Sequence, residues 1–371
     1  MVEGFTAELR ALVDAESPSA DLPAVEACGD HLAEAGERIT GAAPERLPLP
    51  GGPSALVWRR GDPHAPGRVL LLGHRDTVWP VGTAQERPFT VQGGRACGPG
   101  VFDMKAGLLV GLYAVARLDP GVPVTLLVTG DEEVGSAASR ELIEAEALAA
   151  QAVLVLEGAA EGGALKRARK GWSIYTLHCR GRSAHAGLEP QKGSNALVRM
   201  AELVGEAVRL NAPDRGLTVT PTLARAGQTV NTVPDRAELH LDVRAGSAAD
   251  QRRVDERIRG LAAASTGVEV EVEGGENRPP MEDGAAAELL ARAARHAREL
   301  GQEPPGSAAV GGISDANLCA ALGVPTLDGL GAVGGGPHAI HEWVDVEATL
   351  HRIPLVTALV GGLAAHPLPG P

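Results

Sequence analysis

The segment RVLLLGHRD, residues 68–76, sets the pattern for the first half of the chain, because a continuous apolar run ends in it on ionisable side chains. Two later segments, VPVTLLVTGD (122–131) and AVLVLEG (152–158), repeat the arrangement. Such runs are typical of strands buried on both faces of an α/β sheet. Helical patterns at about 104–118 and 136–149 separate them. We therefore expect a mostly parallel sheet covered by helices.

Each apolar run ends on side chains that could carry chemistry: His74 and Asp76, then Glu132 and Glu133, then Glu157. Open α/β sheets place their sites at the carboxyl ends of such strands. Asp76 lies two residues after His74, so both side chains project to the same side and Asp76 could orient the imidazole. An acidic first helical turn would explain Glu132 and Glu133 equally well if they stood alone.

Two further segments add candidate ligands. Asp103 opens a helix after the glycine-rich turn GPGVFD (98–103), where a helix N-cap is the simplest explanation of an isolated aspartate. The segment GGGPHAIHEW (334–343) places His338 and His341 in a backbone-permissive loop. Taken together, oxygen and nitrogen donors at successive strand ends favour a metal site.

The pattern changes near Gly171, where strictly alternating segments such as ELHLDV (238–243) and VEVEVE (268–273) indicate a sheet with one wet face. Between 171 and 280 we expect the order strand, helix, strand, strand, helix, strand of a ferredoxin-like α+β unit. The predicted strands cover 172–180, 218–225, 237–244 and 268–273, and the predicted helices cover 195–210 and 249–264. Helical character then returns and ends in a helix at about 346–364. The sequence thus predicts a discontinuous domain, 1–170 and 281–371, with 171–280 inserted into it.

Composition excludes several classes of function. The 371 residues hold 34 Lys and Arg against 47 Asp and Glu, a formal net charge of −13, which disfavours binding to nucleic acid or to an anionic membrane. The four cysteines form no CxxC pair, so neither a disulfide framework nor a thiolate zinc site is indicated. The N-terminus lacks the pattern of a signal peptide, and we expect no membrane span. A cytoplasmic location is the expectation, and residues 41–54 are expected to form an exposed loop.

The ordered motifs carry a resemblance to a known family. These motifs are GHRDTV (73–78), GPGVFDMKAG (98–107), TGDEEVG (129–135) and GRSAHAG (181–187). Together they resemble the aminoacylase/carboxypeptidase family of dinuclear zinc hydrolases, peptidase clan MH, and are most similar to its glutamate carboxypeptidase type. The resemblance implies an α/β catalytic metal-binding domain interrupted by a ferredoxin-like dimerisation or lid domain. It also implies two Zn²⁺ per subunit, with Co²⁺ or Mn²⁺ as possible substitutes, and a homodimer.

The resemblance also implies roles for individual residues. The implied metal ligands are His74, Asp103, Glu133, Glu157 and His338, with Asp103 bridging both ions and followed by a cis peptide bond. The implied catalytic residues are Glu132 as general base, Asp76 as the orienter of His74, and His185 acting on the partner subunit's site. The implied substrate-binding residues are Asn231, Arg244 and, more weakly, Arg278. His341 remains an alternative to His338, which lies four residues before Glu-Trp as the family pattern requires.

We therefore expect metal-dependent hydrolysis of an amide bond next to a free carboxylate, with release of a C-terminal Glu or Asp-type amino acid. Deacylation of an N-acyl amino acid is the close alternative, so the expected partner is a small peptide or an N-acyl amino acid. A nucleotide-binding protein is a rival of another class, since GLGAVG (329–334) matches GxGxxG, although Pro337 follows where a helix should begin. A non-catalytic binding module is the third hypothesis.

Overall fold

The computed structural model describes residues 1–62, 65, 67–263 and 267–368. The chain forms two compact units. Unit 1 comprises 1–168, 283–310 and 314–371, and unit 2 comprises 169–282 and 311–313.

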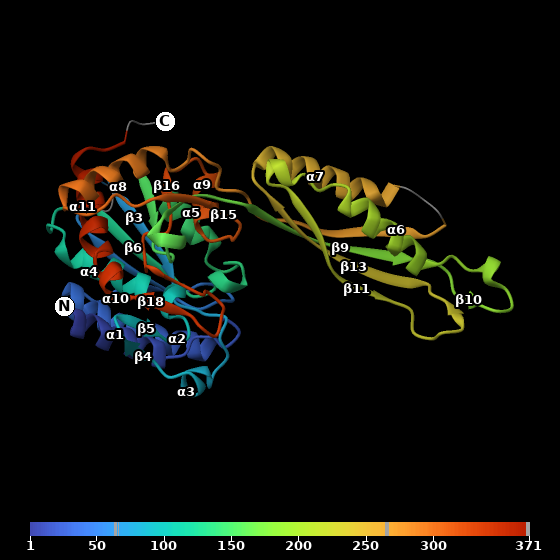
Figure 1. The fold of residues 1–371 in the computed structure, drawn as a ribbon, viewed down its shortest axis with the longest axis horizontal. Helices are drawn as coiled ribbons and strands as arrows, with labels where there is room; N and C mark the ends of the chain where they lie inside the picture. Colours follow the sequence, from blue (N-terminus) through green and yellow to red (C-terminus); the bar gives the residue numbers. More distant parts are fainter. Residues whose placement is uncertain (63–64, 66, 264–266, 369–371) are drawn as a thin grey trace. The chain divides into compact units, whose positions relative to one another are not determined.

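A six-stranded sheet forms the centre of unit 1, with the strand order β1-β2-β6-β3-β7-β16 (Figure 1). Its strands are β1 (Glu45–Leu47), β2 (Ala55–Arg60), β3 (Val69–His74), β6 (Val124–Thr129), β7 (Ala152–Val155) and β16 (Thr326–Leu327). Strands β6, β3, β7 and β16 run parallel, whereas β1 and β2 form an antiparallel edge. Every residue of β3, β6 and β7 is buried, as their continuous apolar sequences predict.

Helices cover this sheet on both sides (Figure 1). The helices of unit 1 are α1 (Val2–Asp14), α2 (Leu22–Thr40), α3 (Thr83–Glu86), α4 (Ala106–Arg117), α5 (Arg140–Leu148), α8 (Ala287–Glu299), α9 (Ala316–Ala321), α10 (Val346–Leu350) and α11 (Arg352–Ala365). Helix α4 lies close to the end of β7, because a Cβ atom at Gly107 would be 2.0 Å from the Leu156 carbonyl oxygen. Only glycine permits this approach, which brings the turn before α4 to the carboxyl edge of the sheet.

Two smaller sheets complete unit 1. The first has the order β17-β18-β5-β4, formed by Gly334–Gly335, Trp343–Asp345, Arg95–Cys97 and Thr90–Gln92. The second pairs β8 (Leu165–Arg169) with β15 (Ser307–Val310). The first of these sheets matters for the site, because β5 precedes the glycine-rich turn and β17 and β18 flank the loop that carries His338.

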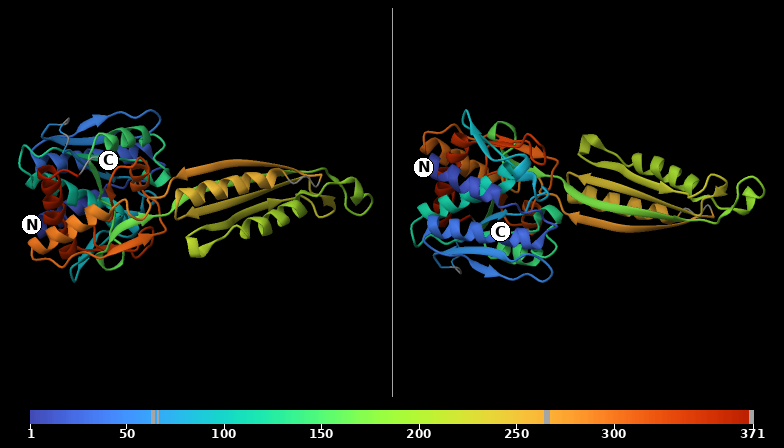
Figure 2. Two further views of the ribbon diagram at one scale, coloured as in Figure 1. Left: turned by 90° about the horizontal axis from the view of Figure 1, so that it is seen from above. Right: turned by 90° about the horizontal axis from the view of Figure 1, so that it is seen from below.

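Unit 2 has the predicted ferredoxin-like order (Figure 2). Its sheet, β11-β13-β9-β14, consists of Thr218–Ala226, Arg236–Ala245, Gly171–Arg180 and Glu269–Arg278. Helices α6 (Ala196–Val208) and α7 (Ala248–Gly260) cover one face, where alternate strand residues such as Leu177 and Leu241 are buried. Asn195 and Ser247 cap the two helices by accepting hydrogen bonds from backbone amides. A short pair, β10 (Ala184–His185) and β12 (Thr232–Val233), extends from this sheet.

The predicted fold class is confirmed, but the structure differs from three local expectations. The expected loop at 41–54 contains β1, which pairs with β2 at the edge of the sheet. The expected strand at 268–273 continues to Arg278. The expected final helix is two helices, α10 and α11, which meet at His351. Residue 264, the last of a predicted helix, lies outside the described residues.

The segment Val346–Ala365 is long and apolar enough to cross a membrane by composition alone. Half of its apolar window is buried inside the protein, and α11 packs against α4. A core helix passes the same test of length and composition, and the burial of Ile353, Val356 and Leu359 identifies α11 as one.

Candidate metal centre

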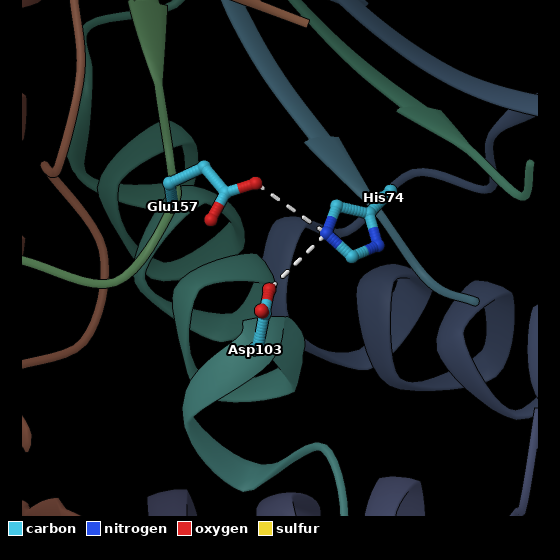
Figure 3. A group of neighbouring side chains, drawn as sticks. All are labelled: His74, Asp103 and Glu157. Carbon is cyan, nitrogen blue, oxygen red and sulfur yellow. Dashed lines mark ion pairs between the residues drawn. The ribbon is translucent and has the colours of Figure 1, made fainter. Parts of the chain in front are cut away.

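Two groups of metal-ligand side chains meet at the carboxyl edge of the unit 1 sheet. One consists of His74, Asp103 and Glu157 (Figure 3), and the other of Asp103, Glu133 and His338. Within each group the candidate ligand atoms all lie within 4.8 Å of one another. Asp103 belongs to both groups, so its carboxylate lies between two possible ion positions.

The distances show how Asp103 is shared. Its Oδ1 lies 3.4 Å from His74 Nε2, which is also 3.5 Å from Glu157 Oε1. Its Oδ2 lies 3.3 Å from His338 Nε2, which is also 3.1 Å from Glu133 Oε2. Each oxygen of Asp103 thus faces a different histidine and a different glutamate. This is the arrangement expected of a carboxylate that bridges two cations.

The strand order explains why residues far apart in sequence meet here. His74 is the last residue of β3, Glu133 lies in the turn Glu132–Val134 just after β6, and Glu157 follows β7 by two residues. These three parallel strands are neighbours, so their carboxyl ends bring the side chains together. Asp103 enters from the turn before α4, and its peptide bond to Met104 is cis, as expected. His338 comes from the loop between β17 and β18 and has a left-handed φ of 58°.

The chemistry of this donor set fits two divalent cations. His74 Nε2 and Glu133 Oε1 are buried and make no hydrogen bond to the described residues. A buried polar atom without a hydrogen bond is costly unless a ligand satisfies it. The two groups supply only imidazole nitrogen and carboxylate oxygen, the donor types of zinc, cobalt and manganese sites. His341 is not part of either group among the described residues, so the geometry favours His338 as the last ligand.

The electrostatics of the cluster follow from burial and close charges. Burial would raise the pKa of Asp103, but the close contacts with the His338 and His74 imidazoles hold that pKa well below its usual value. The same contacts, from Asp103 and Glu133, raise the pKa of His338 to about 10. For Glu133, burial outweighs the histidine contact and raises its pKa. The histidines thus supply, in the metal-free protein, part of the positive charge that the carboxylates require.

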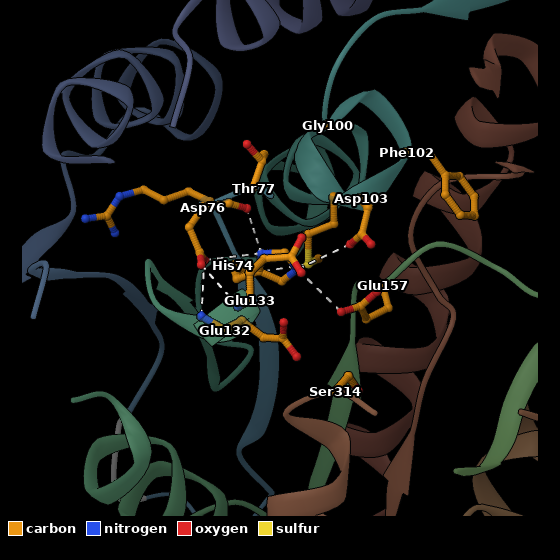
Figure 4. A network of polar contacts seen from close by, with 12 residues as sticks. His74, Asp76, Thr77, Gly100, Phe102, Asp103, Glu132, Glu133, Glu157 and Ser314 are labelled. Carbon is orange, nitrogen blue, oxygen red and sulfur yellow. Dashed lines mark hydrogen bonds and ion pairs between the residues drawn. The ribbon is translucent and has the colours of Figure 1, made fainter. Parts of the chain in front are cut away.

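Asp76 is completely buried and connects His74 to the following loop (Figure 4). Its backbone oxygen lies 3.0 Å from His74 Nδ1, and its carboxylate Oδ1 lies 3.4 Å from the same atom. The carboxylate also accepts hydrogen bonds from the backbone amides of Glu132 and Glu133, at 3.2 and 3.1 Å, and from Ser19 Oγ at 2.7 Å. Asp76 therefore contacts His74 through both its main chain and its side chain, and also fixes the turn that carries the two glutamates.

Glu132 lies beside the cluster without belonging to either ligand group. Its side chain points toward His74 and Glu157 (Figure 4). The residue is buried, with 9% of its surface exposed. Burial raises its pKa well above the usual range, and the carboxylates of Asp315, Glu157 and Glu133 add to the rise. Glu132 is thus a buried carboxylate that lies next to two possible ion positions and belongs to neither ligand group. Such a group is suited to proton transfer.

The candidate residues of unit 2 fall into two sets. His185 and Asn231 are exposed and adjacent: His185 pairs with Thr232 between β10 and β12, and the Ala186 amide donates to the Asn231 carbonyl oxygen at 2.9 Å. His185 Nδ1 accepts hydrogen bonds from the amides of Gly187 and Leu188, at 3.1 Å each. In the neutral ring the proton must then lie on Nε2, which becomes a hydrogen-bond donor.

The side chains of Arg244 and Arg278, which we expected to bind the substrate carboxylate, are held by the protein itself. Arg244 donates from Nε and Nη2 to both carboxylate oxygens of Asp242, at 2.9 and 3.0 Å, and its guanidinium lies 4.9 Å from the centre of the Trp172 ring. Its fork is thus held within the sheet, and Nη1 makes no hydrogen bond to the described residues. Arg278 is completely buried on β14, in register with Trp172. The bonds to Asp242 and the burial of Arg278 were not evident in the sequence.

Sequence reasoning also missed the role of Glu342. Its carboxylate is buried and accepts hydrogen bonds from the backbone amides of the turn that carries Asp103. The only signal in the sequence is its position directly after His338-Ala-Ile-His341. The GxGxxG segment, in contrast, has no nucleotide-binding geometry, because its last glycine begins β17 and leads into a loop instead of a helix.

Fold and site together define a metal-dependent hydrolase of the α/β type. The family model described as "Peptidase family M20/M25/M40" matches residues 70–361. The chain is 31% identical to carboxypeptidase G2 of Pseudomonas sp. (strain RS-16) over 96% of its own length and 88% of that relative. It is 30% identical to acetylornithine deacetylase of Salmonella arizonae over 54% of its length and 56% of that protein. A tripeptidase structure from Staphylococcus aureus has the same fold, with a TM-score of 0.80, 19% identity and 99% of both chains covered.

The chain therefore belongs to peptidase family M20/M25/M40. It is a metallopeptidase and a hydrolase of the carboxypeptidase type, and the family resemblance inferred from its motifs is confirmed. One solved relative, an M20-family peptidase from Bacillus subtilis, is a dinuclear metal-binding protein.

Proposed function

We propose that this enzyme hydrolyses an amide bond next to a free carboxylate and releases a C-terminal amino acid of the Glu or Asp type. The observation that carries the proposal is the placement of Asp103 between His74 and His338, with Glu132 beside the cluster. We assign His74, Asp103, Glu133, Glu157 and His338 as ligands of two Zn²⁺, which Co²⁺ or Mn²⁺ could replace. Two bound divalent ions lower the pKa of a coordinated water to about 7 and polarise the scissile carbonyl.

The protein's own residues move the proton. The Glu132 carboxylate accepts a proton from the attacking water as that water adds to the carbonyl carbon. It then donates this proton to the nitrogen of the leaving amine, so that the C–N bond breaks and Glu132 returns to its ionised form. Asp76 supports both sides of this step, because its carboxylate holds the Glu132 amide and its main chain contacts His74.

We further propose that residues 1–170 and 281–371 form the catalytic domain and that 171–280 form a dimerisation and lid domain. His185 would act on the partner subunit's site, where its Nε2–H donates to the oxyanion. The two amides that bond Nδ1 support this role, because they fix the tautomer that exposes a donor. Removing one oxyanion donor typically costs about 3–4 kcal/mol in the transition state.

Mixing two inactive proteins tests this arrangement. His185→Ala and Glu132→Ala subunits, combined under conditions that exchange subunits, should regain activity because the heterodimer contains one intact site. A mixture that exchanges subunits and stays inactive would exclude action across the dimer.

Asn231 and Arg244 are the proposed contacts of the substrate carboxylate. Asp242 holds the guanidinium of Arg244 in place through Nε and Nη2, so Nη1 is the atom that we assign to the substrate. The complete burial of Arg278 makes it the weaker candidate. Deacylation of an N-acyl amino acid is the second candidate function, because such a substrate has the same free carboxylate and because acetylornithine deacetylase is among the relatives.

Paired substrates test the specificity. A peptide with a C-terminal Glu, its C-terminal amide and the corresponding N-acyl amino acid should be compared by kcat/KM. Amidation should lower kcat/KM sharply in the wild type, and Arg244→Lys should lower it for the free acid, because a lysine cannot make the two bonds to Asp242 that hold the group in place. Equal turnover of free acid and amide would exclude the carboxylate contact. Faster turnover of the N-acyl amino acid than of the peptide would select deacylation.

We also propose a cytoplasmic enzyme that binds neither nucleic acid nor membranes. The net charge of −13 disfavours binding to nucleic acid and to anionic membrane surfaces. Four free cysteines, three of them buried, fit a reducing compartment.

A further inference from the structure

Glu342 has a hydrogen-bonding pattern that no ligand or base assignment explains. The residue directly precedes β18 and is 2% exposed. Its Oε1 accepts from the backbone amides of Phe102 and Asp103, at 2.8 and 3.0 Å. Its Oε2 accepts from the Gly100 amide at 2.8 Å and from the indole Nε1 of Trp79 at 3.0 Å. One buried carboxylate therefore has four N–H donors, two on each oxygen.

Three of these donors belong to the turn that presents Asp103. Gly100 has a left-handed φ of 70°, and a Cβ atom there would be 2.6 Å from Thr77 Cγ2, so the turn is tight. The amide of Asp103 bonds to Glu342, while the two side-chain oxygens of Asp103 face His74 and His338. Glu342 thus holds the main chain of the shared ligand on the side away from the proposed ions.

The fourth donor, the Trp79 indole, extends this contact to the segment that carries His74, and Glu342 itself lies in the segment that carries His338. Trp79 follows His74 by five residues, and the Arg87 guanidinium lies 4.0 Å from the centre of its ring. Glu342 itself follows His338 by four residues, and the next residue, Trp343, begins β18, which pairs with β5. The side chain therefore connects the segments that carry His74, Asp103 and His338.

We propose that Glu342 is a positioning residue that sets the place of Asp103 and thereby the affinity for both metal ions. The proposal rests on the two-metal site of the proposed function. Its physical basis is the acceptor count: a carboxylate offers two acceptor oxygens, whereas the amide of glutamine offers one oxygen and one NH₂ group that only donates. In Glu342→Gln, two of the four donors face the NH₂ group, so the side chain can no longer accept all four hydrogen bonds.

Glu16 supplies a matched control. It is also a glutamate whose carboxylate oxygens each accept a backbone amide, from Gly82 and Ala84, at 2.8 Å each. Residues 82–84, at the start of α3, include no candidate ligand. Glu342→Gln and Glu16→Gln therefore remove the same kind of contact, one at the metal turn and one away from it.

The experiment measures the affinity of metal-depleted protein for Zn²⁺ and Co²⁺ by chelator competition, together with the visible absorption spectrum of the cobalt form. Supporting groups behind metal ligands typically change metal affinity about 10–100-fold when mutated. We expect that loss for both ions in Glu342→Gln, with an altered cobalt spectrum. Glu16→Gln should stay within about twofold of the wild type and keep its spectrum. Trp79→Phe removes one of the four donors and keeps a ring beside Arg87, so it should lower the affinity for both ions by less than Glu342→Gln does.

The outcomes separate this proposal from the function itself. If the wild type binds two ions and Glu342→Gln binds them with the same affinity and spectrum, the positioning role is excluded and the metal site stands. If Glu342→Gln does not fold, Trp79→Phe decides, and wild-type affinity in that variant excludes the role. If the wild type binds neither ion, the metal site and the role of Glu342 both fail. A loss of metal affinity in Glu16→Gln as large as that in Glu342→Gln would contradict a specific role of Glu342, because it would show that the affinity depends on loop stability in general.

Discussion

Replacing Glu132 by glutamine separates proton transfer from metal binding. Glutamine keeps the size of the side chain, and the hydrogen bond from the residue's backbone amide to Asp76 is unaffected. The substitution removes one negative charge from a place where Asp315, Glu157 and Glu133 already disfavour it. We therefore expect Glu132→Gln to fold with at least wild-type thermal stability in the metal-free state, and to bind two ions per chain at saturating metal.

In contrast to folding and metal binding, the turnover of Glu132→Gln should fall steeply. General-base assistance contributes roughly 10²–10⁴-fold to a rate, which corresponds to about 3–5 kcal/mol of barrier. Because Glu132 is only 9% exposed, bulk water cannot replace it easily, and we expect a loss in the upper part of that range. The assay is kcat on a C-terminal Glu peptide together with metal content by elemental analysis.

The neighbouring residue provides the control for this experiment. Glu133→Gln changes the same side chain by the same atoms, but Glu133 lies 3.1 Å from His338 Nε2 inside a ligand group. It should lose metal as well as activity. More than a tenth of wild-type kcat in Glu132→Gln, or a metal loss as large as that of Glu133→Gln, would refute the assignment of Glu132 as a base that is not a ligand.

Two other predictions follow from the described contacts. His338→Ala should lower metal content while His341→Ala leaves it unchanged, as measured after dialysis, and the reverse result would reassign the last ligand. Burial raises the pKa of Glu146, but hydrogen bonds and charges from Arg59 and Arg68 outweigh it and lower that pKa. These contacts therefore stabilise the fold above the unfolded pKa of about 4.3, and the contribution is lost as pH falls through the lowered folded value. In urea unfolding, Glu146→Gln should cost about 1–3 kcal/mol at pH 7 and progressively less in acid, whereas a cost that does not change with pH would contradict this reasoning.

Much of the fold could be predicted because burial leaves a clear mark on the sequence. The runs 69–74 and 124–129 are continuous and apolar, and both are fully buried strands. The alternation in 238–243 identified a strand with one covered face. The edge strand β1 was missed, because three residues in a proline-rich and glycine-rich stretch show no periodicity. The break at His351 was missed although the sequence holds a signal for it: Pro354 cannot donate a hydrogen bond to the Leu350 carbonyl and therefore suits the first turn of a new helix.

The candidate site divides in the same way. The grouping of histidine and carboxylate side chains at strand ends could be predicted, since the strand order of a parallel sheet brings carboxyl ends together. The partners of Arg244 could not, because Asp242 lies two residues away on the same strand and such a pair is common on solvated sheets without any bond. The distinction between His338 and His341 followed only from the family pattern, and it became a geometric statement once His338 was found 3.3 Å from Asp103.

The positions of the candidate ligands depend on one another. Asp103 contributes an oxygen to each ligand group, so a shift of its main chain changes both groups at once. Its position depends on the close approach of α4 to Leu156, which only a glycine at 107 permits, and on the amide bonds to Glu342. Asp76 plays the corresponding part for Glu132 and Glu133, through their two amides. Glu342 and Asp76 are thus two buried carboxylates that we do not assign to an ion. Glu342 holds the turn that carries Asp103, and Asp76 holds the turn that carries Glu132 and Glu133.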